Sequence, residues 1–277
     1  MVKTNSLLGK PRPKLTFIDL FSGVGGFSLG FKEAGFEHLF GLDNWNHACD
    51  VYRKNIGECK EMNIKEFDGK KYKGKVDVLI GSPPCQDFSH ANYQARNSKK
   101  GMVLVNEFMR VVKEIEPKIW IWENVKNVEK HINKITQRVH IFNSNDYGVF
   151  QHRKRCFVSN IILKPEKEHK EFLTKEQMKR VLHFNFVWHK QHFYKPIYTI
   201  TANFRKGNSN PYVIENKQLR CFTISELKMI MSFPFTFNLC NKPESVCYTL
   251  LGNAVPPLLS YRIAEQLKKS LEGEKVE

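Results

Sequence analysis

The sequence of 277 residues predicts an α/β fold with a doubly wound, mostly parallel sheet. Two observations carry this prediction. Short apolar runs, typical of buried strands, alternate along the chain with amphipathic stretches, typical of helices. A glycine-rich loop also joins the first expected strand to the first expected helix, as is common at the ligand-binding edge of such sheets. The hydrophobic content of 41% is sufficient for a substantial core.

The expected elements follow one another in regular order. We expect strands at residues 15–20, 38–42, 76–80, 118–122, 139–142 and 156–162, and helices at residues 27–34, 46–55, 103–115, 223–232 and 258–271. The first helix is closed by Gly35, and Thr223 and Glu226 form a capping-box pattern at the start of the fourth. These elements divide the chain into a main domain at residues 15–160, a small region at residues 161–220, and a segment at residues 221–271 that returns to the main domain.

The chain is strongly basic, with a net charge of +16 and a pI near 9.5. Residues 161–220 hold 12 Lys and Arg against 5 Asp and Glu, a charge of +7, and aromatic residues are interleaved with them. Basic and aromatic side chains together suit a surface that binds nucleic acid. A basic face that is merely solvated is the alternative.

Other patterns argue against several classes of protein. No apolar run reaches 18 residues, so no membrane span is expected, and the polar, basic N-terminus lacks the apolar stretch of a signal peptide. The seven cysteines include no CxxC pair, which argues against a zinc ribbon or a thioredoxin-type redox site. We expect no metal site, reduced thiols and a cytoplasmic protein.

Cys85 is the most informative residue, because it follows the strand at 76–80 directly after two prolines. Ligands of open α/β sheets bind outside the carboxyl ends of the strands, so a thiol there is placed to act as a nucleophile. A buried structural cysteine after a turn is the alternative for Cys85 taken alone. Asp43 follows the strand at 38–42, a position from which an acidic side chain commonly binds ribose hydroxyls.

Six motifs strengthen the functional interpretation of Cys85. They are the loop at residues 19–26, Pro84-Cys85-Gln86, Glu123-Asn124-Val125, a Gln-x-Arg-x-Arg at residues 151–155, an Arg-x-x-Thr-x-x-Glu at residues 220–226, and a Gly-Asn-x-Val at residues 252–255. In this order they resemble the DNA (cytosine-5) methyltransferase family, and the resemblance extends over residues 15–268. It implies a class I methyltransferase fold, Rossmann-like, that transfers a methyl group from S-adenosyl-L-methionine to C5 of a flipped-out cytosine in double-stranded DNA.

The resemblance implies four catalytic residues. Cys85 is expected to add as a thiolate to C6 of the cytosine, which gives C5 carbanion character. Glu123 is expected to hold a proton at the N3 edge of the ring, Arg155 to contact the ring O2, and Arg153 to support the site or bind a phosphate. Loss of the C5 proton after methyl transfer then expels Cys85 and restores the ring.

The resemblance also implies which residues bind the cofactor and the DNA. Phe21 is expected to pack against the adenine and Asp43 to bind the ribose. The cofactor-binding residues expected are Asp19, Phe21, Ser22, Gly23, Gly25, Gly26, Asp43, Asn44, Asn63, Ile64, Pro83, Leu104, Asn253 and Val255. The residues expected to contact DNA are Gln86, Ser89, Arg205 and Lys206, the last two within the target-recognition region at residues 161–220.

Two departures from the family pattern bear on activity. Asn63 stands where the family usually has Asp, and a neutral amide is a weaker acceptor for the adenine amino group than a carboxylate. The segments between Glu123 and Gly148 and between Arg155 and Arg220 are shorter than is usual in the family, which suggests that the sheet has lost a helix.

Two alternative functions stay open. The tRNA cytosine-5 methyltransferases of this fold carry a Cys-Phe-Thr element, which occurs here at residues 221–223 but lies within the ordinary motif at residues 220–226. A catalytically weak DNA-binding relative is the second alternative. The favoured interpretation is a prokaryotic or phage-encoded monomer that methylates DNA in a restriction–modification system, with a cognate restriction endonuclease that acts separately.

Overall fold

The computed structural model describes residues 14–84, 98–132, 138–165, 197–202, 213–215 and 218–273. Its centre is a seven-stranded sheet in the order β3-β2-β1-β4-β5-β8-β6. β1, β2, β3, β4 and β5 pair in parallel, and β8 lies antiparallel between β5 and β6. The strands are β1 (Thr16–Leu20), β2 (Glu37–Asp43), β3 (Cys59–Glu61), β4 (Val78–Gly81), β5 (Ile119–Val125), β6 (Arg138–Asn143) and β8 (Lys154–Ser159). The predicted mostly parallel, doubly wound sheet is confirmed.

The strand order reverses beside β1, because β2 and β3 follow on one side of it and β4 and β5 on the other. Ligands of open α/β sheets bind at such a switch point, outside the carboxyl ends of the strands. Leu20 and Gly81 end β1 and β4 there, side by side in the register of the two strands. This places the loop after β1 next to the turn that leads to Cys85.

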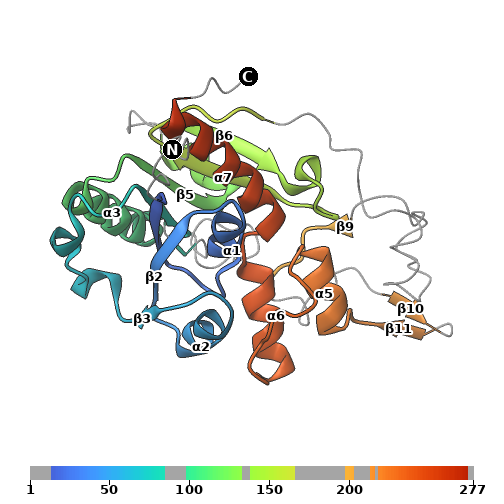
Figure 1. Cartoon of the computed structure of the whole chain (residues 1–277). Helices are drawn as coiled ribbons and strands as arrows, with labels where there is room; N and C mark the ends of the chain where they lie inside the picture. The colour runs from blue at the N-terminus through green and yellow to red at the C-terminus, as the bar shows by residue number, and fades with distance from the viewer. Residues whose placement is uncertain are drawn as a thin grey trace, which may run out of the picture.

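Helices cover both faces of the sheet. Successive residues of β1 point to opposite faces, so that Phe17 packs in a core with α1 (Gly26–Glu33) and α7 (Pro257–Glu272), and Ile18 in a core with α3 (Ser98–Ile115). In Figure 1, α1 and α7 lie side by side and α3 lies apart from them. The alternation of short strands with amphipathic helices in the sequence reflects these two layers.

A third apolar cluster joins α2 (Asn46–Asn55) to α5 (Ile224–Ile230) and α6 (Glu244–Asn253). The predicted capping box is present: Glu226 N donates to Thr223 Oγ1 at 3.2 Å, and Thr223 N donates to the Glu226 carboxylate at 2.7 Å. In Figure 1, α5 lies between α6 and the paired strands β10 (Val213–Glu215) and β11 (Gln218–Arg220). Most of the region at residues 161–220 lies outside the described residues, so the domain division stays a prediction.

Several short elements complete the chain. The 3-10 helices are η1 (Ile64–Glu66), η2 (Gly69–Tyr72), η3 (Lys126–His131) and η4 (Ser144–Tyr147), and two short strands, β7 (Gln151–His152) and β9 (Ile197–Tyr198), pair with each other. Between β5 and β6 the described chain forms only η3, and residues 133–137 lie outside the description. Among the residues described, no helix combines the length and the apolar composition needed to cross a membrane.

Candidate active site

A cavity of about 260 Å³ opens at the carboxyl ends of the parallel strands. Its wall is built from the residues that follow β1, β2 and β4, from the end of β5, and from the turn between α6 and α7. Ten residues predicted from the sequence meet in this wall: Phe21, Ser22, Gly23, Gly26, Asp43, Asn44, Pro83, Glu123, Asn253 and Val255. The cavity therefore unites four of the six motifs.

The loop after β1 is held in a conformation that glycine makes possible. Gly23 has a φ of +52° and donates its N–H to Asp43 Oδ2 at 2.8 Å. Phe21, a non-glycine residue, also has a positive φ of +56°. Gly26 begins α1 directly against the α6–α7 turn, where a Cβ atom would lie 2.2 Å from the Val255 carbonyl oxygen. The backbone at Gly26 thus lies directly against the backbone of the Gly-Asn-x-Val motif at residues 252–255.

Asp43, the last residue of β2, is held by two backbone N–H groups. Its Oδ2 accepts the Gly23 N–H, and its Oδ1 accepts the Trp45 N–H at 2.9 Å. Burial raises the pKa of Asp43, and the backbone N–H groups that it accepts oppose that rise. A carboxylate has about four acceptor positions, so Asp43 can still accept a hydrogen bond from a ligand hydroxyl group in the cavity.

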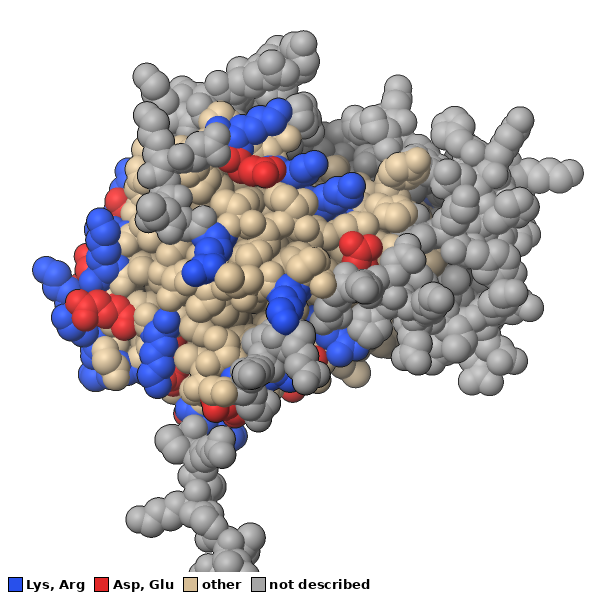
Figure 2. All heavy atoms as spheres, turned by 90° about the horizontal axis from the view of Figure 1, so that it is seen from above, with Lys and Arg blue, Asp and Glu red and all other residues tan. Residues whose placement is uncertain are grey.

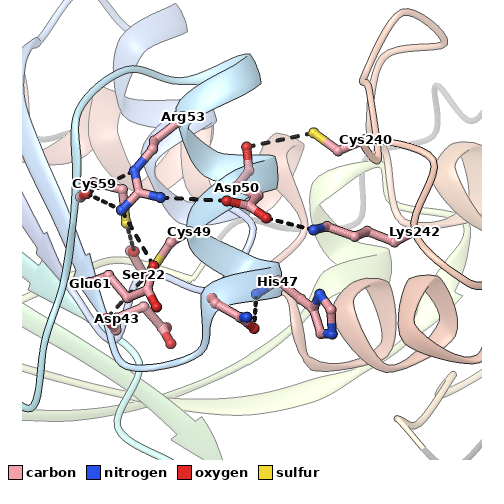
Figure 3. A network of polar contacts seen from close by, with 11 residues as sticks. Ser22, Asp43, His47, Cys49, Asp50, Arg53, Cys59, Glu61, Cys240 and Lys242 are labelled. Atoms are coloured by element: carbon pink, nitrogen blue, oxygen red, sulfur yellow. Dashed lines mark hydrogen bonds and ion pairs between the residues drawn. The ribbon is translucent and has the colours of Figure 1, made fainter.

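A second layer of polar contacts supports Asp43 and Ser22 (Figure 3). Cys49 Sγ donates to the Asp43 carbonyl oxygen at 3.5 Å, and Ser22 Oγ lies 3.8 Å from Cys59 Sγ. The Arg53 guanidinium donates to the Cys59 carbonyl oxygen at 2.9 and 3.1 Å. These contacts hold α2 and the edge strand β3 against the cavity wall, a role that sequence analysis did not assign to either element.

The turn that leads to Cys85 reaches the cavity. Ser82, Pro83 and Pro84 all line it. The Asn124 side chain, 1% exposed, donates from Nδ2 to the Pro83 carbonyl oxygen at 3.0 Å, which joins the end of β5 to this turn. Cys85 follows at once but lies outside the described residues, as do the four predicted DNA contacts, namely Gln86, Ser89, Arg205 and Lys206.

Glu123 lies in the cavity wall beside Arg155. The residue is 6% exposed, and its Oε1 is 3.1 Å from Arg155 Nε. Burial raises the pKa of Glu123, whereas the charges of Arg155 and Arg153 oppose the rise. A buried carboxyl group with a raised pKa beside a cation can hold a proton for a ligand, so the pair is suited to acid–base work.

Arg153 lies behind the wall rather than in it. The residue is 1% exposed, and its guanidinium donates to the carbonyl oxygens of Ile200, Gly252 and Ala254. Gly252 and Ala254 flank Asn253, which does line the cavity. This position is compatible with the supporting role expected for Arg153.

Five predicted cofactor-binding residues lie outside the wall of the described cavity. Asp19 is buried and accepts from Ser28 Oγ at 2.6 Å, and burial raises the pKa of Asp19 well above its usual range. The others are Gly25, Asn63, Ile64 and Leu104; Ile64 and Leu104 belong to the core that faces α3. Asn63 caps η1, with its Oδ1 accepting the Lys65 N–H at 3.1 Å.

Sequence analysis missed seven residues of the wall. They are Val24, Phe27, Trp45, Ser82, Pro84, Leu250 and Ala254. Most are immediate neighbours of predicted residues, so their place in the motifs was the available signal. Leu250 is the exception, because it is three residues before Asn253 in the sequence. The helical conformation of α6 brings Leu250 and Asn253 to the same face of the helix.

Comparison with known proteins agrees with this geometry. The model of the family of C-5 cytosine-specific DNA methylases matches residues 15–210 and 160–269. The type II methyltransferase M1.HphI of Haemophilus parahaemolyticus is 30% identical over 334 residues, with 92% of this chain and 87% of that protein covered. M.AplI of Arthrospira platensis is 29% identical over 313 residues, with 94% and 87% covered.

Solved structures share the fold. The Entamoeba histolytica methyltransferase EhMeth has a TM-score of 0.71 and 20% identity, with 94% of this chain and 99% of that chain covered. The S. pombe Dnmt2 methyltransferase has a TM-score of 0.65 and 18% identity, with 93% and 99% covered. At these identities the likeness concerns the fold alone. The match of the family model over most of the sequence shows that this chain belongs to the C-5 cytosine-specific DNA methylases and is a DNA (cytosine-5) methyltransferase.

Proposed function

We propose that the chain methylates C5 of a cytosine flipped out of double-stranded DNA, through a bond between Cys85 Sγ and C6 of the base. One observation supports this proposal above the others. The turn that ends in Pro84, directly before Cys85, lines the same cavity as Glu123. A nucleophile and an acid–base group can thereby act on one ring.

The remainder of the cavity fits S-adenosyl-L-methionine. The Phe21 side chain offers an apolar surface for the adenine, and Asp43 offers acceptors for the ribose hydroxyls. The loop at residues 22–26 lets the methionine end approach the backbone at the start of α1, and Asn253 and Val255 complete the wall. Bound S-adenosyl-L-methionine supplies an electrophilic methyl group.

The chain's own groups prepare the base. The Cys85 thiolate adds to C6, and a proton held by Glu123 at N3 neutralises the charge that develops on the ring. We assign contact with the O2 edge of the same base to Arg155, which contacts Glu123. C5 then accepts the methyl group, with S-adenosylhomocysteine as the leaving group. Solvent water accepts the C5 proton, the C5–H electron pair restores the ring double bond and expels the thiolate from C6, and the N3 proton returns to Glu123. The free enzyme is restored, and the base carries one methyl group in place of one proton.

The basic charge of the chain supports DNA as the partner. On the face drawn in Figure 2, Lys and Arg side chains are dispersed over a largely uncharged surface rather than gathered in one patch. The charge of +7 over residues 161–220 makes this region the candidate for phosphate contacts. By analogy with the type II methyltransferases it resembles, we place the enzyme in the cytoplasm, in a restriction–modification system with a separate cognate endonuclease.

A labelling experiment tests the proposed function. The purified chain is incubated with S-adenosyl-L-methionine labelled in the methyl group and with either unmethylated genomic DNA or tRNA, and the modified bases are mapped. We expect label at C5 of cytosine within one short DNA sequence. Label in tRNA alone would support the RNA-modifying alternative, and DNA binding without label would support a catalytically silent relative.

A further inference from the structure

The Arg153 guanidinium joins two parts of the chain that are far apart in sequence. Its Nη1 donates to the Ile200 carbonyl oxygen at 2.8 Å. Its Nη2 donates to the carbonyl oxygens of Gly252 and Ala254, at 2.8 and 3.1 Å. The residue is 1% exposed, so these bonds form in the interior, where charge-assisted hydrogen bonds are strong and the loss of a partner is costly.

The first partner belongs to residues 197–202, one of the described pieces of the region expected to recognise the target. Ile200 is held at both ends, since its N–H donates to Gln151 Oε1 at 3.0 Å and its carbonyl accepts from Arg153. Thr199 Oγ1 donates to the His152 carbonyl oxygen at 2.7 Å, and β9 pairs with β7. Gln151 thus joins this segment to the end of α5, since its Nε2 donates to Met231 Sδ at 3.1 Å, whereas Arg153 joins the segment to the end of α6.

The second pair of partners belongs to the wall of the cavity. Asn253, Ala254 and Val255 line it, and Arg153 holds the carbonyl groups on either side of Asn253. The two segments also touch directly, because a Cβ atom at Gly252 would lie 2.6 Å from the Thr201 carbonyl oxygen. A shift of residues 197–202 would therefore be transmitted to the cavity wall through Arg153 and through Gly252.

We propose that Arg153 is a positioning residue that couples the binding of DNA at the recognition region to the binding of the cofactor in the cavity. The inference rests on the proposed function, which assigns those two ligands to those two places. The planar guanidinium suits the task because it presents donors in several fixed directions to carbonyl groups of two segments. A lysine ammonium at this position keeps the charge but cannot span the same set of carbonyl groups.

Calorimetry with S-adenosylhomocysteine measures this coupling. Its affinity is determined for the free enzyme and for the enzyme saturated with a duplex that carries the mapped methylation site. In the wild type we expect the duplex to tighten binding. In Arg153→Lys we expect binding to the free enzyme to be about tenfold weaker and the gain from DNA to be lost. In Gln151→Ala, which spares the bonds to α6, we expect unchanged affinity in the free enzyme and a reduced gain from DNA.

Two further variants make the test decisive. Lys154→Ala removes an exposed neighbouring charge, and we expect it to change neither quantity. Gly252→Ala presses α6 and Thr201 apart with Arg153 intact, so it should reproduce the loss of coupling if Arg153→Lys does not fold, as judged by circular dichroism.

The outcomes separate this inference from the proposed function. A folded Arg153→Lys or Gly252→Ala enzyme with wild-type affinity and a wild-type gain from DNA overturns the inference, as does a wild type that shows no gain. A wild type that methylates no nucleic acid overturns the proposed function instead. The free-enzyme affinities of the four variants then still decide whether Arg153 positions the cavity wall.

Discussion

Arg155 Nε lies 3.1 Å from Glu123 Oε1, across the antiparallel pair of strands β8 and β5. The pairing places Arg155 opposite Val125, two residues beyond Glu123, so the arginine side chain reaches back along β5 to the carboxylate. Burial raises the pKa of Glu123 while this cation lowers it. The two opposing effects leave Glu123 a group that can both hold and release a proton in the cavity.

Replacement of Glu123 by Gln should slow methylation far more than it weakens DNA binding. The amide keeps the shape of the carboxyl group but cannot share a proton with N3, and loss of an acid–base group typically costs about 10²–10⁴-fold in rate. Single-turnover rates and DNA affinities measured on the same preparation check this. An unchanged rate with raised Michaelis constants would remove Glu123 from the chemistry.

The change Asn63→Asp should tighten the binding of S-adenosyl-L-methionine. The Asn63 Oδ1 already accepts the Lys65 N–H and carries no charge, so it is a weak second acceptor, and Nδ2 can only donate. An aspartate retains the cap and provides a second, charged acceptor for the adenine amino group. Calorimetry on the wild type and the variant measures the difference, with Asn63→Ala as the control that removes the cap. Equal affinities in the wild type and in Asn63→Asp would mean that the adenine does not lie beside this residue.

Because of His38, the free energy of unfolding should decrease as the pH falls from about 6.5 to about 4. Burial, together with the charge of Lys32, lowers the pKa of His38 from 6.5 to about 4, and its Nε2 lies 2.8 Å from the Tyr52 hydroxyl. Between these two pH values the unfolded chain binds the proton and the folded chain does not, so stability falls as the pH falls. Urea unfolding midpoints measured across this range should decline less steeply in His38→Gln. Parallel pH profiles for the two proteins would contradict this assignment.

Arg205 and Lys206 should influence which DNA is methylated. Both residues precede the polar sequence Gly-Asn-Ser-Asn at residues 207–210, which is typical of a loop, and both carry positive charge within the recognition region. We expect Arg205→Ala to reduce methylation of the preferred site and to leave the reactivity of Cys85 toward small alkylating agents unchanged. Unchanged site preference and unchanged DNA affinity in both Arg205→Ala and Lys206→Ala would assign recognition to other residues.

Sequence analysis located the main elements of the sheet because their apolar runs are bounded by clear turn signals. It missed β3 and α6 for physical reasons. β3 consists of Cys59, Lys60 and Glu61 at an edge of the sheet, and three residues with two charges among them show no strand pattern. The middle of α6, residues 246–251, has one Thr among apolar residues and no charge, so no polar face opposite the buried residues marks it as a helix.

The candidate site was predictable only where a motif carries it. Asp43, Glu123 and Asn253 meet in the cavity as expected, because each lies at the end of a strand or helix that reaches the same edge of the sheet. The partners of Arg153 could not be predicted, since Ile200, Gly252 and Ala254 contribute only backbone carbonyl groups. Every residue type has a backbone carbonyl group, so the sequence does not indicate which of these groups accept hydrogen bonds from Arg153.

The role of Cys85 as nucleophile is the central claim, and a trapping experiment tests it most directly. A duplex whose target cytosine is replaced by 5-fluorocytosine is incubated with enzyme and S-adenosyl-L-methionine, and the products are separated under denaturing conditions. Fluorine at C5 blocks the final elimination, so we predict a stable covalent complex whose link to the DNA maps to Cys85. Cys85→Ala should form none while still binding the duplex. A Cys85→Ala enzyme that traps this DNA as the wild type does would contradict the account.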